Sequence, residues 1–203
     1  TSELKNSSLY EITKVAHAAT SLAELYKSIH ANINDLMFAE NMFIAIHNQK
    51  KDIITFPYYV DKYDNFQGTS DEFDDKSLTC NCILEGIPLL LSKNELLDFT
   101  NAKNNKNEIK PKGTIPEYWL GCPLIVREET IGAIVVQSYE KNNNISIDDR
   151  DLLSFVSELL AIVIQNKRLE AKQLEYQSNL KKKIDERTKE LFYAKEKAES
   201  ATK

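Results

Sequence analysis

Three cysteines and three histidines have the most versatile side chains in this chain. Cys80 and Cys82 are separated by one residue, Cys122 is remote from them, and His17 and His30 lie thirteen residues apart. A metal, haem or iron–sulfur site needs a cluster of such ligands, often as two close pairs. No second pair accompanies Cys80 and Cys82. We therefore predict buried free thiols, with no metal ligand, no catalytic residue and no resident cofactor in this chain.

A second group of side chains has the character of a small-molecule pocket, which is mostly apolar with a few convergent polar groups. They lie in runs that alternate as strands do, and in one short helix. Tyr58 and Trp119 are the strongest candidates, because each combines a large ring with a polar tip. The alternative for every position is an ordinary place in the core. The pocket candidates are Phe43, Ile46, Phe56, Tyr58, Cys82, Trp119 and Gln137.

Acidic residues are concentrated in the segment 61–76, which includes Asp61, Asp64, Asp71 and Glu72. The segment lacks the Asp-x-Asp-x-Asp-Gly order of a calcium-binding loop. We interpret it as a solvated loop that covers the pocket as a lid.

The elements that must position these residues are strands and short helices between residues 38 and 150. Asn41–His47 and Asp52–Val60 are rich in aromatic and β-branched residues, which predicts a hairpin. Pro57 lacks a backbone donor, so the second strand should bulge or lie at an edge of the sheet. Tyr118–Val126 and Ile131–Tyr139 are apolar on both faces, which indicates a sheet covered on both sides.

Two short helices are predicted between the strands. Ser77–Glu85 is followed by Gly86, a residue that commonly ends helices in a left-handed conformation. Ser92 and Glu95 have the spacing of a capping box, and Ser146 and Asp149 repeat this spacing before a long C-terminal helix.

An apolar stripe runs along the C-terminal segment 151–203, which contains no Pro or Gly. Its members step alternately by three and four residues, the a/d spacing of a coiled coil. Such a helix needs a partner helix to bury the stripe, so we predict a parallel homodimer, an arrangement that Asn166 favours. We call this stripe the seam, and it includes Leu159, Ile162, Asn166, Leu169, Gln173, Tyr176, Leu180, Ile184 and Leu191.

The spacing of the seam changes at Tyr176, Leu180 and Ile184, which follow one another at intervals of four. This pattern is a stutter, and it locally unwinds a supercoil. Our hypothesis is that a ligand in the pocket changes the rotation or register of the helices across this joint. The alternative is a static spacer.

A similar stripe occupies the N-terminal segment 1–37, with Ile12 and Val15 near its start and Tyr26, Ile29 and Ile33 near its end. We predict that this segment forms a helix and packs in a dimer bundle with the C-terminal helices.

Charge and composition restrict the partners. The net charge of -5, from 31 acidic and 26 basic residues, argues against nucleic-acid binding. No apolar run reaches the roughly 18 residues of a membrane span, so we expect no direct membrane insertion in this segment. An odd number of cysteines without a Cys-x-x-Cys pair favours a cytoplasmic location.

The order of these elements resembles a GAF domain over about residues 22–166, most clearly in Gly121–Tyr139. That stretch has the family's Pro-Leu strand, tight turn and following strand with Gly at its second position. The resemblance implies an α+β fold in which residues 38–150 form a central antiparallel sheet of about six strands. The N- and C-terminal helices flank this sheet, and the C-terminal helix extends as a coiled coil. It also implies a sensing and dimerising module of a signalling protein.

The tail, Glu186–Leu191 and Ala194–Ala201, resembles the linker that precedes the phosphoacceptor helix of bacterial sensor histidine kinases. This resemblance implies a cytoplasmic regulatory and dimerisation domain of a two-component kinase, a transferase, with kinase domains downstream in the same chain. No histidine here lies in a phosphoacceptor motif, so this segment is not itself an enzyme. The alternatives are a ligand-free dimerisation scaffold and the regulatory GAF domain of a diguanylate cyclase.

Three ligand or activity types of GAF relatives are less favoured. The cyclic-nucleotide signature is absent, and no cysteine is followed by the His typical of bilin attachment. One GAF-fold family reduces free methionine sulfoxide with cysteines. Cys122 lies in a predicted strand and the Gly-rich surroundings of that family's cysteines are missing, so this activity ranks lowest. An unidentified small-molecule ligand remains open.

Overall fold

The computed structural model describes residues 14, 19, 21–74, 77–103 and 113–201. The chain forms two compact units, residues 1–163 and 164–203. The first unit contains a six-stranded sheet in which every neighbouring pair of strands is antiparallel. The α+β prediction with a central antiparallel sheet is therefore confirmed.

The strands follow the spatial order β3-β2-β1-β6-β5-β4. The central strands β1 and β6 are buried along most of their length, and the edge strand β3 is short, acidic and largely exposed. The strands are β1 (Asn41–Asn48), β2 (Ile53–Val60), β3 (Ser70–Glu72), β4 (Leu89–Ser92), β5 (Tyr118–Val126) and β6 (Glu129–Ser138).

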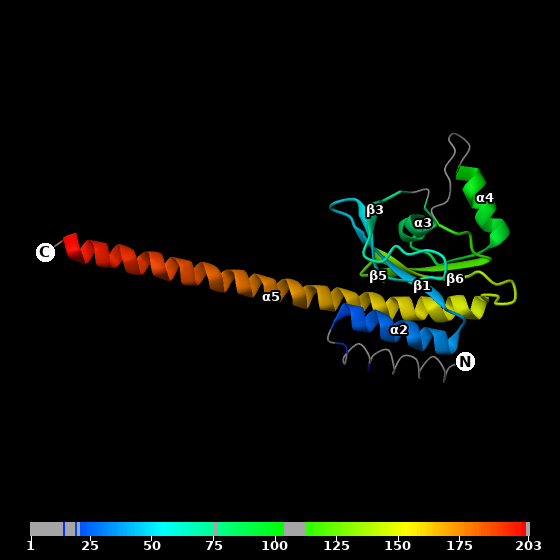
Figure 1. Ribbon diagram of the computed structural model, residues 1–203, viewed down its shortest axis with the longest axis horizontal. Coiled ribbons are helices and arrows are strands. Elements are labelled where there is room, and N and C mark those ends of the chain that lie inside the picture. The colour runs from blue at the N-terminus through cyan, green and yellow to red at the C-terminus, as the bar shows by residue number, and fades with distance from the viewer. Residues whose placement is uncertain (1–13, 15–18, 20, 75–76, 104–112, 202–203) are drawn as a thin grey trace. The chain divides into compact units, whose positions relative to one another are not determined.

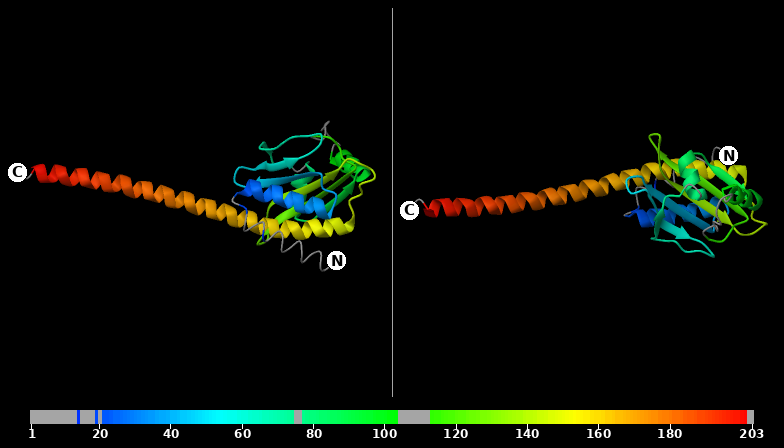
Figure 2. Two further views of the ribbon diagram at one scale, coloured as in Figure 1. Left: turned by 60° about the horizontal axis from the view of Figure 1, so that its bottom comes forward. Right: turned by 90° about the horizontal axis from the view of Figure 1, so that it is seen from above.

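Helices cover both faces of the sheet (Figure 1). The short helix α3 lies on one face, and α2 with the first part of α5 lies on the other; Figure 2 shows the same elements from two further directions. This agrees with strands that are apolar on both sides. The helices are α2 (Leu22–Leu36), α3 (Leu78–Glu85), α4 (Lys93–Lys103) and α5 (Ile147–Ala201).

The predicted hairpin of β1 and β2 is present, and β2 bulges at Pro57. Ile44 lies opposite Tyr58, but Ile46 lies opposite Thr55. Two steps along β1 therefore match three steps along β2, which means that β2 carries one extra residue. Pro57 has no N–H to donate and occupies this irregular stretch. The predicted irregularity is thus confirmed.

The turn between β5 and β6 is tighter than predicted. β6 begins at Glu129 rather than at Ile131, which leaves only Arg127 and Glu128 between the strands. Both residues have positive φ, 49° and 69°. This is the backbone pattern of a two-residue type I′ hairpin turn, which is normally occupied by Asn and Gly.

The predicted helix ends are present. Gly86 has a φ of 64°, and its N–H donates to the Cys82 carbonyl at the end of α3. Ser146 and Asp149 form a reciprocal box: the Asp149 carboxylate accepts from the Ser146 N–H at 2.8 Å and from its hydroxyl at 2.7 Å. The Asp149 N–H donates to Ser146 Oγ at 3.2 Å. These bonds satisfy backbone donors at the start of α5.

The described part of the N-terminal stripe is buried within the chain itself. Tyr26, Ile29 and Ile33 of α2 have almost no exposed surface. Ile12 and Val15 lie outside the described residues. The dimer bundle that involves segment 1–37 remains a prediction.

Helix α5 has two different apolar stripes in the first unit. Leu153, Val156 and Leu160 are fully buried. The seam residue Leu159 is half-buried, and Ile162 is 50% exposed. The seam is therefore not the stripe that the domain uses for its own core.

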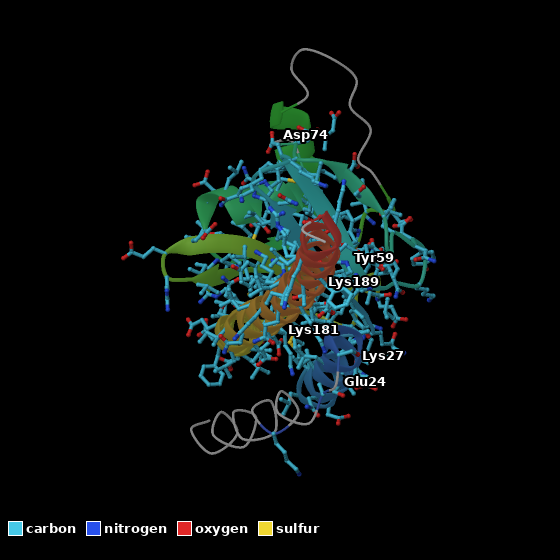
Figure 3. The ribbon with its side chains drawn as sticks, turned by 90° about the vertical axis from the view of Figure 1, so that its left-hand side faces the viewer. Glu24, Lys27, Tyr59, Asp74, Lys181 and Lys189 are labelled. Carbon is cyan, nitrogen blue, oxygen red and sulfur yellow. The ribbon has the colours of Figure 1, made fainter. Side chains whose placement is uncertain are left out.

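In the second unit the described residues form only helix, from Ile164 to Ala201. Leu169 is 52% exposed and Leu180 is 45% exposed, and the other apolar members of the seam in this unit are also exposed. The same helix carries the charged residues Lys181 and Lys189, which are labelled in Figure 3. None of the described helices has both the length and the apolar character needed to cross a bilayer.

Candidate ligand site

An apolar cluster fills the space between the sheet and the short helices α3 and α4. The cluster combines inward-facing residues of four strands with the buried side of α3 and one residue of α4. Its buried members are Phe43, Ala45, Ile54, Tyr59, Cys80, Cys82, Ile83, Leu96, Trp119, Ala133 and Val135.

The cluster brings together most of the pocket candidates. Phe43, Cys82 and Trp119 are buried in it, and Phe56 packs against it. Gln137 lies opposite Trp119 in the β5–β6 pairing. Because it follows Val135 by two residues on β6, Gln137 faces the same side of the sheet.

Trp119 has room for its indole because of the residue two positions along β5. A Cβ atom at Gly121 would lie 2.3 Å from the Trp119 ring. The glycine therefore lets the ring lie flat over the strand.

Ile46 and Tyr58 lie on the opposite face of the sheet, so our expectation that they share this pocket face was wrong. Tyr58 donates its hydroxyl hydrogen to His30 Nδ1 of α2, at 2.7 Å, while His30 Nε2 is bonded to the Ala39 carbonyl. The bulge at Pro57 explains Tyr58, because it reverses the alternation after Phe56. Ile46 follows Ala45, which faces the cluster, and so points away from it.

Four aromatic rings gather at one side of the cluster around Tyr59. The Tyr59 ring stacks on Phe43 with centroids 4.8 Å apart, and it meets Phe66 edge-on at 5.4 Å and Phe56 edge-on at 6.0 Å. Such geometries are the favourable ones for aromatic pairs. We call Phe43, Phe56, Tyr59 and Phe66 the aromatic group.

Tyr59 and Phe66 are not among the residues that the sequence marks as pocket candidates. The sequence does contain a signal for Tyr59, because one extra residue at Pro57 places Phe56 and Tyr59 on the same face of the sheet. Phe66 lies in the predicted lid loop, where Gly68 N–H donates to the Phe56 carbonyl at 2.8 Å. No periodic pattern in the loop indicates that its phenylalanine turns inward.

Asp61 anchors the start of the lid loop. Its carboxylate accepts from the N–H groups of Tyr63 and Asp64 at 2.9 and 3.1 Å, and from the Tyr139 hydroxyl at 2.9 Å. Gln137 Oε1 also lies 2.9 Å from that hydroxyl. Burial, the bond to Asp61 and the nearby negative charges raise the pKa of Tyr139, so the phenol stays protonated.

Asp64 connects the lid loop to the segment before β5. Its Oδ2 accepts from the Thr114 N–H at 2.7 Å. Gly113 has a φ of 92°, and a Cβ atom there would lie 2.8 Å from the same oxygen. The positive φ favours glycine at this position, and the other oxygen of Asp64, Oδ1, accepts no hydrogen bond from the described residues.

The Tyr59 hydroxyl is close enough to Asp61 and Asp64 for their charges to act on it. Burial raises its pKa, and the charges of Asp61 and Asp64 raise it further. The Tyr59 side chain is largely buried, but its hydroxyl is not one of the buried polar atoms without a partner, which among the described residues are Asn32 Nδ2 and His47 Nε2. Tyr59 belongs to β2 and is labelled in Figure 3. The surroundings of the Tyr59 hydroxyl are therefore electronegative.

The three cysteines are free and buried. Burial raises the pKa of Cys82 to about 12 and that of Cys122 to about 11, and it also raises the pKa of Cys80. Near neutral pH such thiols stay protonated and are poor nucleophiles. In the described part of the chain, no three His, Cys, Asp or Glu side chains are grouped so that they could hold a metal ion.

The antiparallel sheet, its covering on both faces and the short helices beside the aromatic group are features of a known family. A family model described as the GAF domain matches residues 19–165, more than half of the chain. This chain belongs to the GAF domain family. The aromatic group of this GAF domain lies inside the matched region.

Solved GAF domains share the fold at low sequence identity. One, from a phosphoenolpyruvate-protein phosphotransferase of Coxiella burnetii, is 17% identical, with 83% of this chain and 96% of that chain covered and a TM-score of 0.66. Another, from an Acinetobacter phosphoenolpyruvate-protein phosphotransferase, is 16% identical, with 83% and 97% covered and a TM-score of 0.65.

A third similar structure is the GAF domain of a two-component sensor histidine kinase from Bacillus halodurans. It is 14% identical to this GAF domain, with 75% of this chain and 99% of that chain covered and a TM-score of 0.60. No curated protein matches the chain. These similarities establish the fold and leave the signal and the output to be argued from the residues.

Proposed function

We propose that this GAF domain is the cytoplasmic sensory and dimerisation segment of a bacterial two-component sensor histidine kinase. It relays a small-molecule or conformational signal through a parallel coiled coil to kinase domains downstream in the same chain. The observation that carries this proposal is the seam of α5, which is exposed while the neighbouring stripe of Leu153, Val156 and Leu160 is buried.

Two stripes on one helix imply two partners. The domain core covers the inner stripe, and a second copy of the seam is the partner that heptad spacing fits best. Burying a leucine side chain is worth about 2 kcal/mol. Enough apolar surface to support pairing is therefore supplied by Leu169, Leu180 and Leu191. The polar positions Asn166 and Gln173 stabilise the pair less and set its register.

The stutter at Leu180 supplies a place where the paired helices can rotate. A relay of this kind needs two arrangements that differ by about 1–3 kcal/mol, so that a ligand can shift their populations. The tail from Glu186 onward, with its resemblance to kinase linkers, supports a histidine kinase as the output.

Pairing is tested by disulfide formation at single introduced cysteines. Leu169→Cys lies in the seam, and Ala171→Cys, two residues away on the outer face, is the matched control. In a parallel dimer the first variant forms an interchain disulfide in high yield and the second does not. The native thiols do not interfere because all three are buried. Equal yields at both positions would contradict the proposal.

The output is tested separately in the full-length parent protein. ATP-dependent phosphorylation of a histidine downstream of Lys203 supports the kinase proposal. Synthesis of cyclic di-guanylate by that protein would instead support a diguanylate cyclase.

A ligand-free scaffold and a methionine sulfoxide reductase each have a distinct experimental signature. The scaffold predicts that native mass spectrometry of fresh protein finds no carried molecule and that no added ligand binds. The reductase predicts turnover with thioredoxin that Cys82→Ser abolishes. The raised pKa values of Cys82 and Cys122 weigh against the reductase.

A further inference from the structure

Tyr139 lies where the sheet, the lid loop and the connection to α5 meet. It follows Ser138, the last residue of β6, and the short connection after it leads to Ile147, the first residue of α5. Its hydroxyl lies 2.9 Å from Asp61 Oδ2 at the start of the lid loop and 2.9 Å from Gln137 Oε1 on β6. Tyr139 therefore belongs to the connection and contacts both the loop and the sheet.

The start of the lid loop is held against the end of β6 by contacts around this tyrosine. The Tyr63 ring meets the Tyr139 ring edge-on, with centroids 4.6 Å apart. The side chain of Asn41, a buried residue of β1, donates to the Gln137 carbonyl at 3.2 Å and accepts from the Lys62 N–H at 2.9 Å. A movement of the loop start therefore changes the contacts that Tyr139 makes.

The Tyr139 hydroxyl has one hydrogen and two neighbouring acceptors. A phenol donates a single hydrogen bond, so the hydrogen goes to Asp61 or to Gln137 and not to both. A bond to a carboxylate is the stronger one, which favours Asp61 while the loop start is in place. When the loop start moves away, Gln137 accepts the hydrogen and the half-buried phenol keeps a partner. The second acceptor therefore lowers the cost of releasing the loop.

The connection after Tyr139 is ordered up to the start of α5. The Asn143 N–H donates to the Glu140 carbonyl at 3.1 Å, and Ile145 is buried. The Ser146–Asp149 box then begins the helix. An ordered connection passes a change at its first residue on to the helix, whereas a loose one would absorb it.

We propose that Tyr139 is a two-position latch that couples the lid loop to α5. With its hydrogen on Asp61 the loop start is held against the sheet. With its hydrogen on Gln137 the loop start is released and the connection to α5 relaxes. A ligand that moves the loop shifts the balance between these two positions. The inference rests on the proposed sensory function and deepens it, because it names the route from the lid loop to the output helix.

The test measures hydrogen exchange of the Tyr63 and Asp64 amides, which donate to Asp61. Tyr139→Phe removes the hydroxyl and keeps the ring. It is expected to speed this exchange about tenfold, the effect of losing a hydrogen bond to a charged group. Gln137→Met removes the second acceptor at similar side-chain length. It is expected to slow the same exchange, because release of the loop then leaves the hydroxyl unpaired.

The two variants must therefore act in opposite directions. In a fixed clasp the Gln137 amide nitrogen would donate to the phenol, and Gln137→Met would speed the exchange as Tyr139→Phe does. That result, or unchanged exchange in Gln137→Met, overturns the proposal. Amides in the centres of β1 and β5 give the reference rate for global unfolding. Gln137→Met alone decides the question if Tyr139→Phe does not fold.

The coupling to α5 has a separate test. Asp61→Ala removes the acceptor on the loop, and it is expected to speed exchange of the Asn143 amide about fivefold or more. Asn65→Ala is the matched control, since it removes the acceptor of the Gln67 N–H within the same loop and leaves the Asn143 rate unchanged. Unchanged exchange at Asn143 in Asp61→Ala, or equal acceleration by both variants, overturns the coupling.

Failure of the latch is distinguishable from failure of the proposed function. Disulfide formation at Leu169→Cys does not depend on Tyr139. A chain that pairs through the seam but lacks the opposed effects keeps its dimerisation role and loses this route for the signal.

Discussion

At the scale of single residues, burial fixes the chemistry of the thiols. The pKa of Cys82 is raised from 9.0 to about 12, so the folded chain holds a proton that the unfolded chain releases above about pH 9. The contribution to stability is therefore complete below pH 9 and is lost as the pH rises toward 12. One such proton changes the free energy of unfolding by about 1.4 kcal/mol per pH unit.

We predict that Cys82→Ala makes the loss of stability above pH 9 less steep by up to about 1.4 kcal/mol per pH unit. Urea denaturation at a series of pH values measures this slope. Ile83→Val, a truncation in the same cluster that removes no titrating group, lowers stability at every pH and leaves the slope as in the original chain. Identical slopes in all three proteins would show that the Cys82 thiol ionises equally in both states.

The turn between β5 and β6 is a second feature that individual residues decide. Arg127 and Glu128 hold positive φ, which is unfavourable for residues with a Cβ atom. We predict that Arg127→Asn with Glu128→Gly stabilises the chain by about 1 kcal/mol, because Asn and Gly adopt type I′ geometry readily. Chemical denaturation measures the gain.

The control for this change is Lys50→Gly in the turn between β1 and β2. Lys50 does not have a positive φ, so glycine there brings no relief and costs backbone entropy. A gain at Lys50 as large as the gain at the β5–β6 turn would contradict the geometric explanation.

Single residues also show where the sequence interpretation failed. Simple alternation from Phe56 predicts that Tyr58 faces the pocket, although the bulge that reverses the alternation is itself predicted from Pro57. Applying that bulge selects Tyr59 instead. The regular strands and helix that carry Trp119, Cys82 and Phe43 place these three residues in the cluster together. Contact between a ligand and any of these three residues stays a prediction.

At the scale of elements, the N-terminal cap of α5 decides where this helix begins. The Ser146–Asp149 box satisfies backbone donors that would otherwise lack partners. We predict that Ser146→Ala lowers the stability of the domain by about 1 kcal/mol. Thermal unfolding followed by circular dichroism measures the change. Ser178→Ala, in the exposed middle of the same helix, changes stability little, and an equal loss there would contradict the capping explanation.

Elements with strong local signals could be predicted almost to the residue. Tyr118–Val126 is β5 as expected, and Gly86 ends α3 in the left-handed conformation. The short strand β3 was missed, since Ser70–Glu72 is polar and pairs only because the loop around Phe66 brings it alongside β2. A strand of this kind is stabilised by tertiary contacts rather than by its own composition.

At the scale of the whole molecule, the exposed seam predicts association. We expect Leu169→Glu with Leu180→Glu to convert the dimer to monomers, because the charges would face each other across the pairing surface. Analytical ultracentrifugation measures the mass. Leu174→Glu is the matched control, since Leu174 is also exposed but lies off the seam. A monomeric original chain, or dissociation caused equally by Leu174→Glu, would remove the basis of the relay.

The sequence was informative about architecture and less so about the ligand. The GAF fold followed from element order, whereas the inward position of Phe66 depends on the lid loop, whose path no periodicity encodes. Dimerisation and output are properties of more than one chain or domain, and they remain proposals until pairing and phosphorylation are measured.

The acidic edge strand β3 has a practical consequence for the protein at high concentration. An open strand edge is a template on which further chains can stack into fibres, and charge and shortness are the usual safeguards. With Asp71 and Glu72 on a strand of three residues, this edge offers a poor template. Neutralising both carboxylates would therefore be expected to favour aggregation in storage before it impairs folding.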